Sequence, residues 1–177
     1  EPAPQDIATV DDASIVFIHG LDLDLWVDTI IENADGDLTV ITVTDGIELV
    51  DRRHDPEEDG ESGDEHDHDQ GDPHVWLDPT RTSQMVANIA AALIAADPDG
   101  ADGYTARLTA YQQELAALDA QIAERVNLVP ADRRIIVTNH EALGYFADRY
   151  GLTIVGTVIP GGAAGSEPSA GEIADLL

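Results

Sequence analysis

Apolar residues follow two different periods along this chain, and each change of period marks an expected strand or helix. The run 14–18 and the β-branched run 38–43 have the length of buried strands. Between them, apolar side chains recur at helical spacing over 23–33. The first part of the chain is therefore expected to form a strand, a helix and a second strand.

Two longer helical patterns follow. Pro79 is a favourable first helical residue with Asp78 before it as N-cap, and Asp97-Pro98 marks the expected end of that helix. Apolar residues then step by threes and fours over 104–127. At a rise of about 1.5 Å per residue, this second helix would be about 36 Å long, which is long enough to join two lobes.

The segment after Pro130 has the pattern of a compact parallel unit. The expected elements are a strand over 135–138, a helix over 141–150 closed by Gly151, and a strand over 153–158. A single helix between two strands implies a parallel pair with a right-handed crossover. Ser169 and Glu172 form a capping-box pattern that opens a last helix, which the chain leaves unfinished at Leu177. The whole pattern is typical of an α/β protein.

Charge narrows the choice of partners. The chain has 36 acidic and 8 basic residues and a formal net charge of −28, so neither nucleic acid nor an anionic membrane surface is an expected partner. At molar salt the screening length falls to about 3 Å and the self-repulsion of so many acids weakens. We interpret the acids as a solvated surface adapted to high salt; an acidic interaction tail is the alternative.

The side chains available for chemistry are also limited. The chain has no cysteine, so a metal site would use His, Asp and Glu. No apolar run approaches the roughly 20 residues of a membrane span. No HExxH pair, G-x-S-x-G elbow or phosphate-binding loop with Lys occurs. We therefore expect a protein that is not an enzyme.

All six histidines are candidate metal ligands, in three different settings. His74 lies in a rigid stretch between Pro73 and a Val-Trp-Leu run expected to be buried, and His140 lies where a strand ends and a helix begins. From position alone, each is equally well explained as a histidine bonded to nearby backbone. His19 also ends a strand, where it could be an extra ligand or a residue lining the same cleft.

The other three histidines, His54, His66 and His68, lie in the acidic, glycine-rich segment 51–72, which we expect to be a disordered surface loop. Such a loop could hold divalent cations weakly. Ordering it would cost about 1–2 kcal/mol per residue, which argues against a closed site. A solvated acidic loop with incidental histidines is the alternative.

Four stretches together resemble one known family. They are EPAPQDIATVDDASIVFIHGLDLDLW at the start, DPHVWLDP at 72–79, PADRRIIVTNHEALGYFADRYGL at 130–152 and EPSAGEIADLL at 167–177. They are similar to the zinc/manganese receptors of ABC importers, the cluster 9 solute-binding proteins, with the zinc-uptake receptor as the closest type.

The resemblance implies two α/β lobes of parallel sheet with flanking helices, joined by one long helix, with the metal bound between the lobes. On this chain it implies a metal-binding lobe over 1–100, a linking helix over 101–128 and the start of a second lobe over 129–177, which is incomplete here.

The resemblance also implies which residues hold the metal. In the family the ligands are a His just before an E-P-x-P segment, the His of DPHVWLDP, a His or Glu after a Thr-Asn or Thr-Ser pair, and a late acid. The second is His74 and the third is His140, while the first and fourth are expected before Glu1 and beyond Leu177. A His at the third position favours zinc, because manganese prefers carboxylate oxygen. The family more often has Asn where this chain has His19.

The function implied is capture of Zn²⁺ outside the cell and its delivery to the permease of an ABC importer. We expect a monomer, secreted or held at the membrane only by a lipid anchor upstream. A manganese or iron(II) receptor of the same family is one alternative. A zinc-dependent hydrolase and an adhesion lipoprotein are alternatives from other classes.

Overall fold

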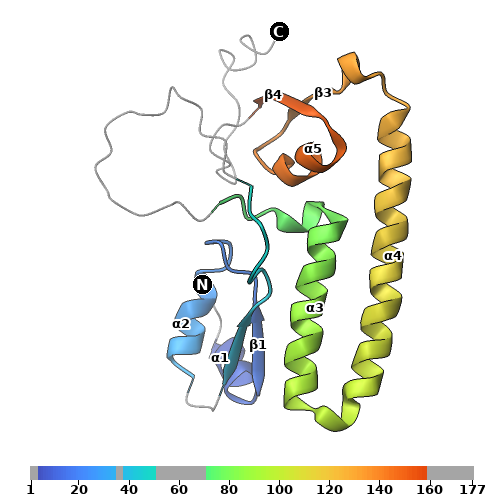
Figure 1. Ribbon diagram of the computed structural model, residues 1–177. Helices are drawn as coiled ribbons and strands as arrows, with labels where there is room; N and C mark the ends of the chain where they lie inside the picture. The colour runs from blue at the N-terminus through green and yellow to red at the C-terminus, as the bar shows by residue number, and fades with distance from the viewer. Residues whose placement is uncertain (1–3, 35–37, 51–70, 159–177) are drawn as a thin grey trace, which may run out of the picture. The chain divides into compact units, whose positions relative to one another are not determined.

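The computed structural model describes residues 4–34, 38–50 and 71–158. Figure 1 shows its helices and strands. Its contacts divide the chain into two compact units. Unit 1 comprises Glu1–Glu48 with Thr80–Leu115, and unit 2 comprises Leu49–Pro79 with Ala116–Leu177. The lobe boundaries drawn from the sequence place residues 49–79 with the first lobe, whereas the structure groups them with the later part of the chain.

Unit 1 contains a two-stranded parallel sheet. Its strands are β1 (Ile15–Ile18) and β2 (Thr39–Thr42), paired in register from Ile15↔Thr39 to Ile18↔Thr42. Helix α1 (Pro4–Asp11) precedes the sheet and α2 (Trp26–Glu32) connects its strands. Both expected strands are therefore confirmed.

Helix α2 begins three residues later than its apolar pattern indicated. Gly20, Leu21 and Asp22 all adopt positive φ angles, of 82°, 56° and 61°. A left-handed backbone is incompatible with a right-handed helix. The chain therefore makes a turn after β1 before the helix can start, and hydrophobic periodicity does not report this turn.

The two long helices form as expected. They are α3 (Pro79–Ala96) and α4 (Ala101–Asn127), connected by the 3₁₀ turn η2 (Pro98–Gly100). Asp97 closes the turn by accepting hydrogen bonds from the Gly100 N–H and the Tyr104 hydroxyl. Within unit 1, Asn88 of α3 donates to the carbonyls of Val43 and Asp45, which fixes α3 to the end of β2. Helix α4 contributes its first half to unit 1 and its second half to unit 2.

Unit 2 contains the second parallel pair. Its elements are the 3₁₀ turns η1 (Val75–Leu77) and η3 (Ala131–Arg133), strands β3 (Ile135–Thr138) and β4 (Thr153–Thr157), and helix α5 (Gly144–Tyr150). Strands β3 and β4 run parallel with a register shift between Ile136 and Val137. The predicted parallel strand–helix–strand unit is confirmed, and Gly151 ends α5 with φ of 68°.

Several of the most deeply buried side chains of unit 2 lie within the DPHVWLDP motif or next to it. Val75 and Tyr145 are fully buried and Asp78 is 1% exposed. Trp76 is 41% exposed, so the expectation that the whole Val-Trp-Leu run is buried was wrong. The tight 3₁₀ turn explains the difference, because consecutive side chains of a helical turn point in different directions.

Residues 51–70 of the loop expected over 51–72, and the helix expected from Ser169, lie outside the described residues. The expectation of disorder was wrong for Asp72, which is 5% exposed and donates its N–H to the Val50 carbonyl. Among the residues that are described, no helix is long and apolar enough to cross a membrane.

Candidate metal centre

His74 stands at the start of η1 and is held by Asp72. The backbone N–H of His74 donates to Asp72 Oδ1 at 2.9 Å, and His74 Nδ1 lies 2.7 Å from the same oxygen. The His74 side chain is 19% exposed and that of Asp72 is 8% exposed. One ring edge of His74 is thus occupied by a buried carboxyl group, while part of the ring still reaches solvent.

His140 lies in the turn between β3 and α5. Its carbonyl accepts a hydrogen bond from the Ala142 N–H at 2.8 Å, so the backbone turns sharply just after the histidine. This turn also explains why α5 begins at Gly144 rather than at Glu141, where the sequence placed its start. The His140 side chain is exposed.

The structure brings His74 and His140 together. Their ring centroids are 5.4 Å apart with an interplanar angle of 62°. Zn–N bonds of about 2.0–2.1 Å at a tetrahedral angle would place two imidazole centroids at about 5 Å. The spacing of the two rings therefore fits two ligands of one small cation, although their positions are 66 residues apart in the sequence (140 − 74).

His19 is the one other histidine among the described residues. His19 belongs to unit 1, whereas His74 and His140 belong to unit 2. The backbone of His19 is fixed, since its N–H donates to Asp24 and its carbonyl accepts from the Thr44 hydroxyl at 2.6 Å. His54, His66 and His68 lie outside the described residues.

The pair could supply two ligands, whereas a structural zinc site usually has four. Within 4–34, 38–50 and 71–158, no group of three or more His, Asp or Glu side chains converges to hold a metal ion. The expectation that the other two ligands lie outside this chain stays a prediction.

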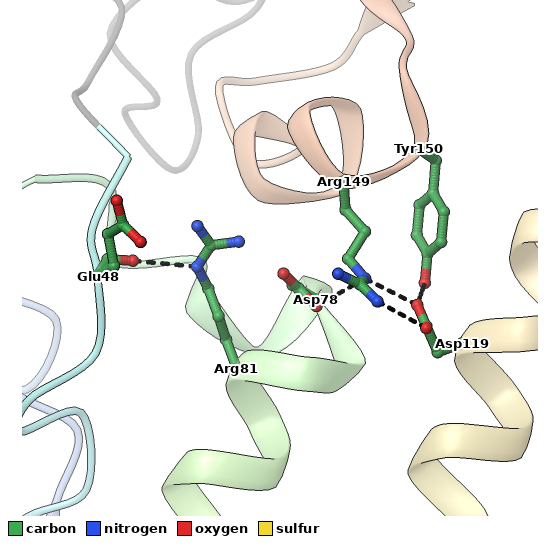
Figure 2. A network of polar contacts seen from close by, with 6 residues as sticks. All are labelled: Glu48, Asp78, Arg81, Asp119, Arg149 and Tyr150. Carbon is green, nitrogen blue, oxygen red and sulfur yellow. Dashed lines mark hydrogen bonds and ion pairs between the residues drawn. The ribbon is translucent and has the colours of Figure 1, made fainter.

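Figure 2 shows a network of charged and aromatic side chains around Arg149 that lies in unit 2, and a separate hydrogen bond from Arg81 to the Glu48 carbonyl in unit 1. Arg149 of α5 donates twice to Asp119 of α4, at 2.8 and 2.6 Å, and also lies 3.4 Å from Asp78, just before α3. The Tyr150 hydroxyl donates to Asp119 at 2.9 Å. These bonds connect α5 with α4 and with the end of the DPHVWLDP motif, which carries His74.

The contacts of this network shift the pKa values of Asp119 and Tyr150. Hydrogen bonds from the Arg149 guanidinium hold the pKa of Asp119 below its usual range. Burial, reinforced by the bond to Asp119, raises the pKa of Tyr150 to about 12. Arg149 and Asp119 are therefore an ion pair across the ordinary pH range.

Sequence reasoning missed the roles of Asp72, Tyr145 and Arg149. A carboxylate two residues before a candidate ligand histidine is a local signal that could have indicated Asp72. The partners of Tyr145 and Arg149 lie 73 and 30 residues away along the chain. Hydrophobic periodicity contains no information about contacts of that separation.

The chain has two α/β units that share one long helix, and a pair of histidines lies in the loops of the second unit. The chain belongs to the family described as zinc-uptake complex component A, periplasmic (ZnuA), whose model matches residues 1–177.

Individual relatives bind different metals. The chain is 35% identical over 156 residues to the manganese-binding lipoprotein MntA of Halalkalibacterium halodurans, covering 88% of this chain and 47% of MntA. It is 33% identical over 177 residues to the zinc-binding lipoprotein AdcA of Streptococcus pneumoniae, covering 99% of this chain and 34% of AdcA.

A solved structure supports the same fold. The Zn(II)-bound ZnuA-like domain of Streptococcus pneumoniae AdcA matches with a TM-score of 0.74 and 29% identity, covering 99% of this chain and 59% of that one. The chain spans between a third and about half the length of the curated relatives named above.

Proposed function

We propose that this chain is part of an extracytoplasmic receptor that captures Zn²⁺ and delivers it to the permease of an ABC importer. The observation that carries the proposal is the pairing of His74 and His140 with ring centroids 5.4 Å apart. Membership of the zinc-uptake family supports the transport role. Lipoprotein relatives support a location at the outer face of the membrane. In this proposal the protein is a monomeric receptor and not an enzyme.

Zinc is the preferred cargo in this proposal. Two imidazoles suit zinc, whereas manganese favours carboxylate, carbonyl and water oxygen. One similar relative is a manganese-binding protein and another a zinc-binding protein, so similarity alone does not choose between the metals. The donor atoms of the pair are what favours zinc.

Two further features are part of the proposal. The segment with His54, His66 and His68 would collect divalent cations weakly, supported by its mixture of histidines and acids. The net charge of −28 supports a high-salt setting.

Isothermal titration with Zn²⁺ of a complete receptor, which adds the expected first and fourth ligands to this chain, tests the central claim. We expect one phase near one equivalent that is abolished by the double substitution His74→Ala with His140→Ala. His19→Ala in unit 1 and a triple Ala substitution of the loop histidines should both leave this phase in place. A phase near one equivalent that survives in the double variant would refute the assignment, and displacement of Zn²⁺ by a modest excess of Mn²⁺ would refute the preference for zinc.

A further inference from the structure

Asp72 lies two positions before the candidate ligand His74 and contacts both its backbone and its ring. Its Oδ1 lies 2.9 Å from the backbone nitrogen and 2.7 Å from the ring Nδ1 of His74. An ionised carboxylate has acceptors and no donor, so a neutral His74 must carry its proton on Nδ1 to complete this contact. The lone pair of the imidazole is then on Nε2, the nitrogen that remains available to a metal ion.

Asp72 is itself fixed from several sides. Its carbonyl accepts the Tyr145 hydroxyl at 2.6 Å and its N–H donates to the Val50 carbonyl at 3.0 Å. The same Tyr145 hydroxyl accepts the Val50 N–H at 3.3 Å. Tyr145 is fully buried. The backbone of Asp72 is therefore held by the core of unit 2.

Gly144 has no side chain, and this leaves room for the carboxylate of Asp72. A Cβ atom built on Gly144 would lie 2.6 Å from Asp72 Oδ2, a distance that forces one of the two groups to move. The first residue of α5 must therefore be glycine for the carboxylate to occupy its place. The second carboxylate oxygen therefore lies in space that a Cβ at this position would fill.

We propose that Asp72 is a positioning residue of the metal site, which holds the His74 ring in the Nδ1–H tautomer so that Nε2 is free for the cation. The inference deepens the proposed function and rests on it for the identity of the cation. A carboxylate or carbonyl partner on the second nitrogen is the arrangement found at most metal-bound histidines, and its loss typically lowers metal affinity about 10–100-fold. Tyr145 and Gly144 affect the His74 ring only indirectly, because they hold Asp72 or leave room for it.

Ring ¹⁵N NMR of the metal-free chain, at a pH where imidazole is neutral, tests the tautomer directly. In the unaltered protein we expect a protonated Nδ1 and an unprotonated Nε2 for His74. Asp72→Ala should move the ring toward the Nε2–H form, and Asp72→Asn should preserve part of the effect because its amide oxygen still accepts. Gly144→Ala should act like Asp72→Ala by displacing the carboxylate.

Asp78→Asn is the matched control. It removes a second buried carboxylate of the same segment, which lies near Arg149 rather than His74, and should leave the His74 tautomer unchanged. An Nε2–H ring in the unaltered protein, or an unchanged ring in Asp72→Ala, would overturn the proposal. An equal shift in Asp78→Asn would do the same, because it would show a general loosening. Should Asp72→Ala fail to fold, as judged by circular dichroism, Asp72→Asn and Gly144→Ala decide.

Competition for Zn²⁺ with a chromophoric chelator provides the second measurement. Asp72→Ala should bind zinc about 10–100-fold more weakly than the unaltered chain, with Asp72→Asn between them and Asp78→Asn unchanged. Absence of zinc binding in a complete receptor that contains this chain would contradict the proposed function and leave the NMR result intact. If Asp72→Ala bound zinc as tightly as the unaltered protein, the result would contradict the positioning role alone.

Discussion

At the scale of single residues, Arg149 shows how one side chain can join three parts of unit 2. Its guanidinium makes a bidentate ion pair with Asp119 of α4 and lies 3.4 Å from Asp78 at the start of α3. Asp78 is 1% exposed, so its charge needs a partner within the protein. The planar, always charged guanidinium can serve two carboxylates at once, which a lysine could not do with the same geometry.

We predict that Asp119→Asn destabilises the chain by about 1–2 kcal/mol at neutral pH, because hydrogen bonds to charged groups contribute about that much. The pKa of Asp119 is lowered in the folded state. Its carboxylate therefore stabilises the fold above its unfolded pKa, and this contribution is lost as the pH falls through the lowered folded pKa. Urea unfolding at a series of pH values should show the difference between the two proteins shrinking on the acid side.

The control for that experiment is Asp132→Asn, at an exposed acid in η3 of the same unit. It changes the net charge equally and should alter stability little, or raise it slightly by reducing self-repulsion. Equal destabilisation by the two substitutions would show that the Arg149 network is not responsible.

Reading elements from the sequence worked where one local signal decided the structure. Helix α3 begins at Pro79, as its proline indicated, and α5 ends at Gly151, as its glycine indicated. It failed where backbone conformation overrode periodicity. The positive φ angles at Gly20, Leu21 and Asp22 delay α2. The turn at His140 delays the start of α5, and no side-chain pattern in the sequence predicts this turn.

The two glycines Gly151 and Gly103 give a matched test of this reasoning. Gly151 has φ of 68° at the end of α5, so Gly151→Ala should cost about 1 kcal/mol because a Cβ disfavours the left-handed conformation. Gly103 lies inside α4, and its nearest neighbour for a Cβ is the mobile end of Arg107 at 3.3 Å. Gly103→Ala should therefore stabilise by up to about 1 kcal/mol.

Thermal and urea unfolding of both variants would check the opposite signs. A stabilising Gly151→Ala would show that α5 does not need a left-handed residue to end.

For the protein as a whole, the family motifs predict the fold, whereas the composition predicts how stability depends on the solvent. The motif stretches predicted the α/β fold and the family. The two ligands that the resemblance implied, His74 and His140, have ring centroids 5.4 Å apart, and their role as ligands stays a prediction. The supporting residues Asp72 and Tyr145 could not be assigned in advance, because their roles depend on contacts that only the folded chain creates. Composition instead predicts how the chain responds to its solvent.

The net charge of −28 predicts that the stability of the chain depends on salt. Self-repulsion of the acids should destabilise the chain in dilute buffer, and molar salt should relieve it as the screening length falls from about 10 Å to about 3 Å. We expect the Tm to rise by roughly 5 °C or more between low salt and molar NaCl, equivalent to about 2 kcal/mol for a chain of this size. Differential scanning calorimetry in NaCl, in Na₂SO₄ at equal ionic strength and in sucrose separates the causes. Screening predicts a similar rise in both salts and little in low-salt sucrose. A rise confined to sulfate and sucrose would instead indicate exclusion of cosolvent from the surface, and the acids would then have no part in it.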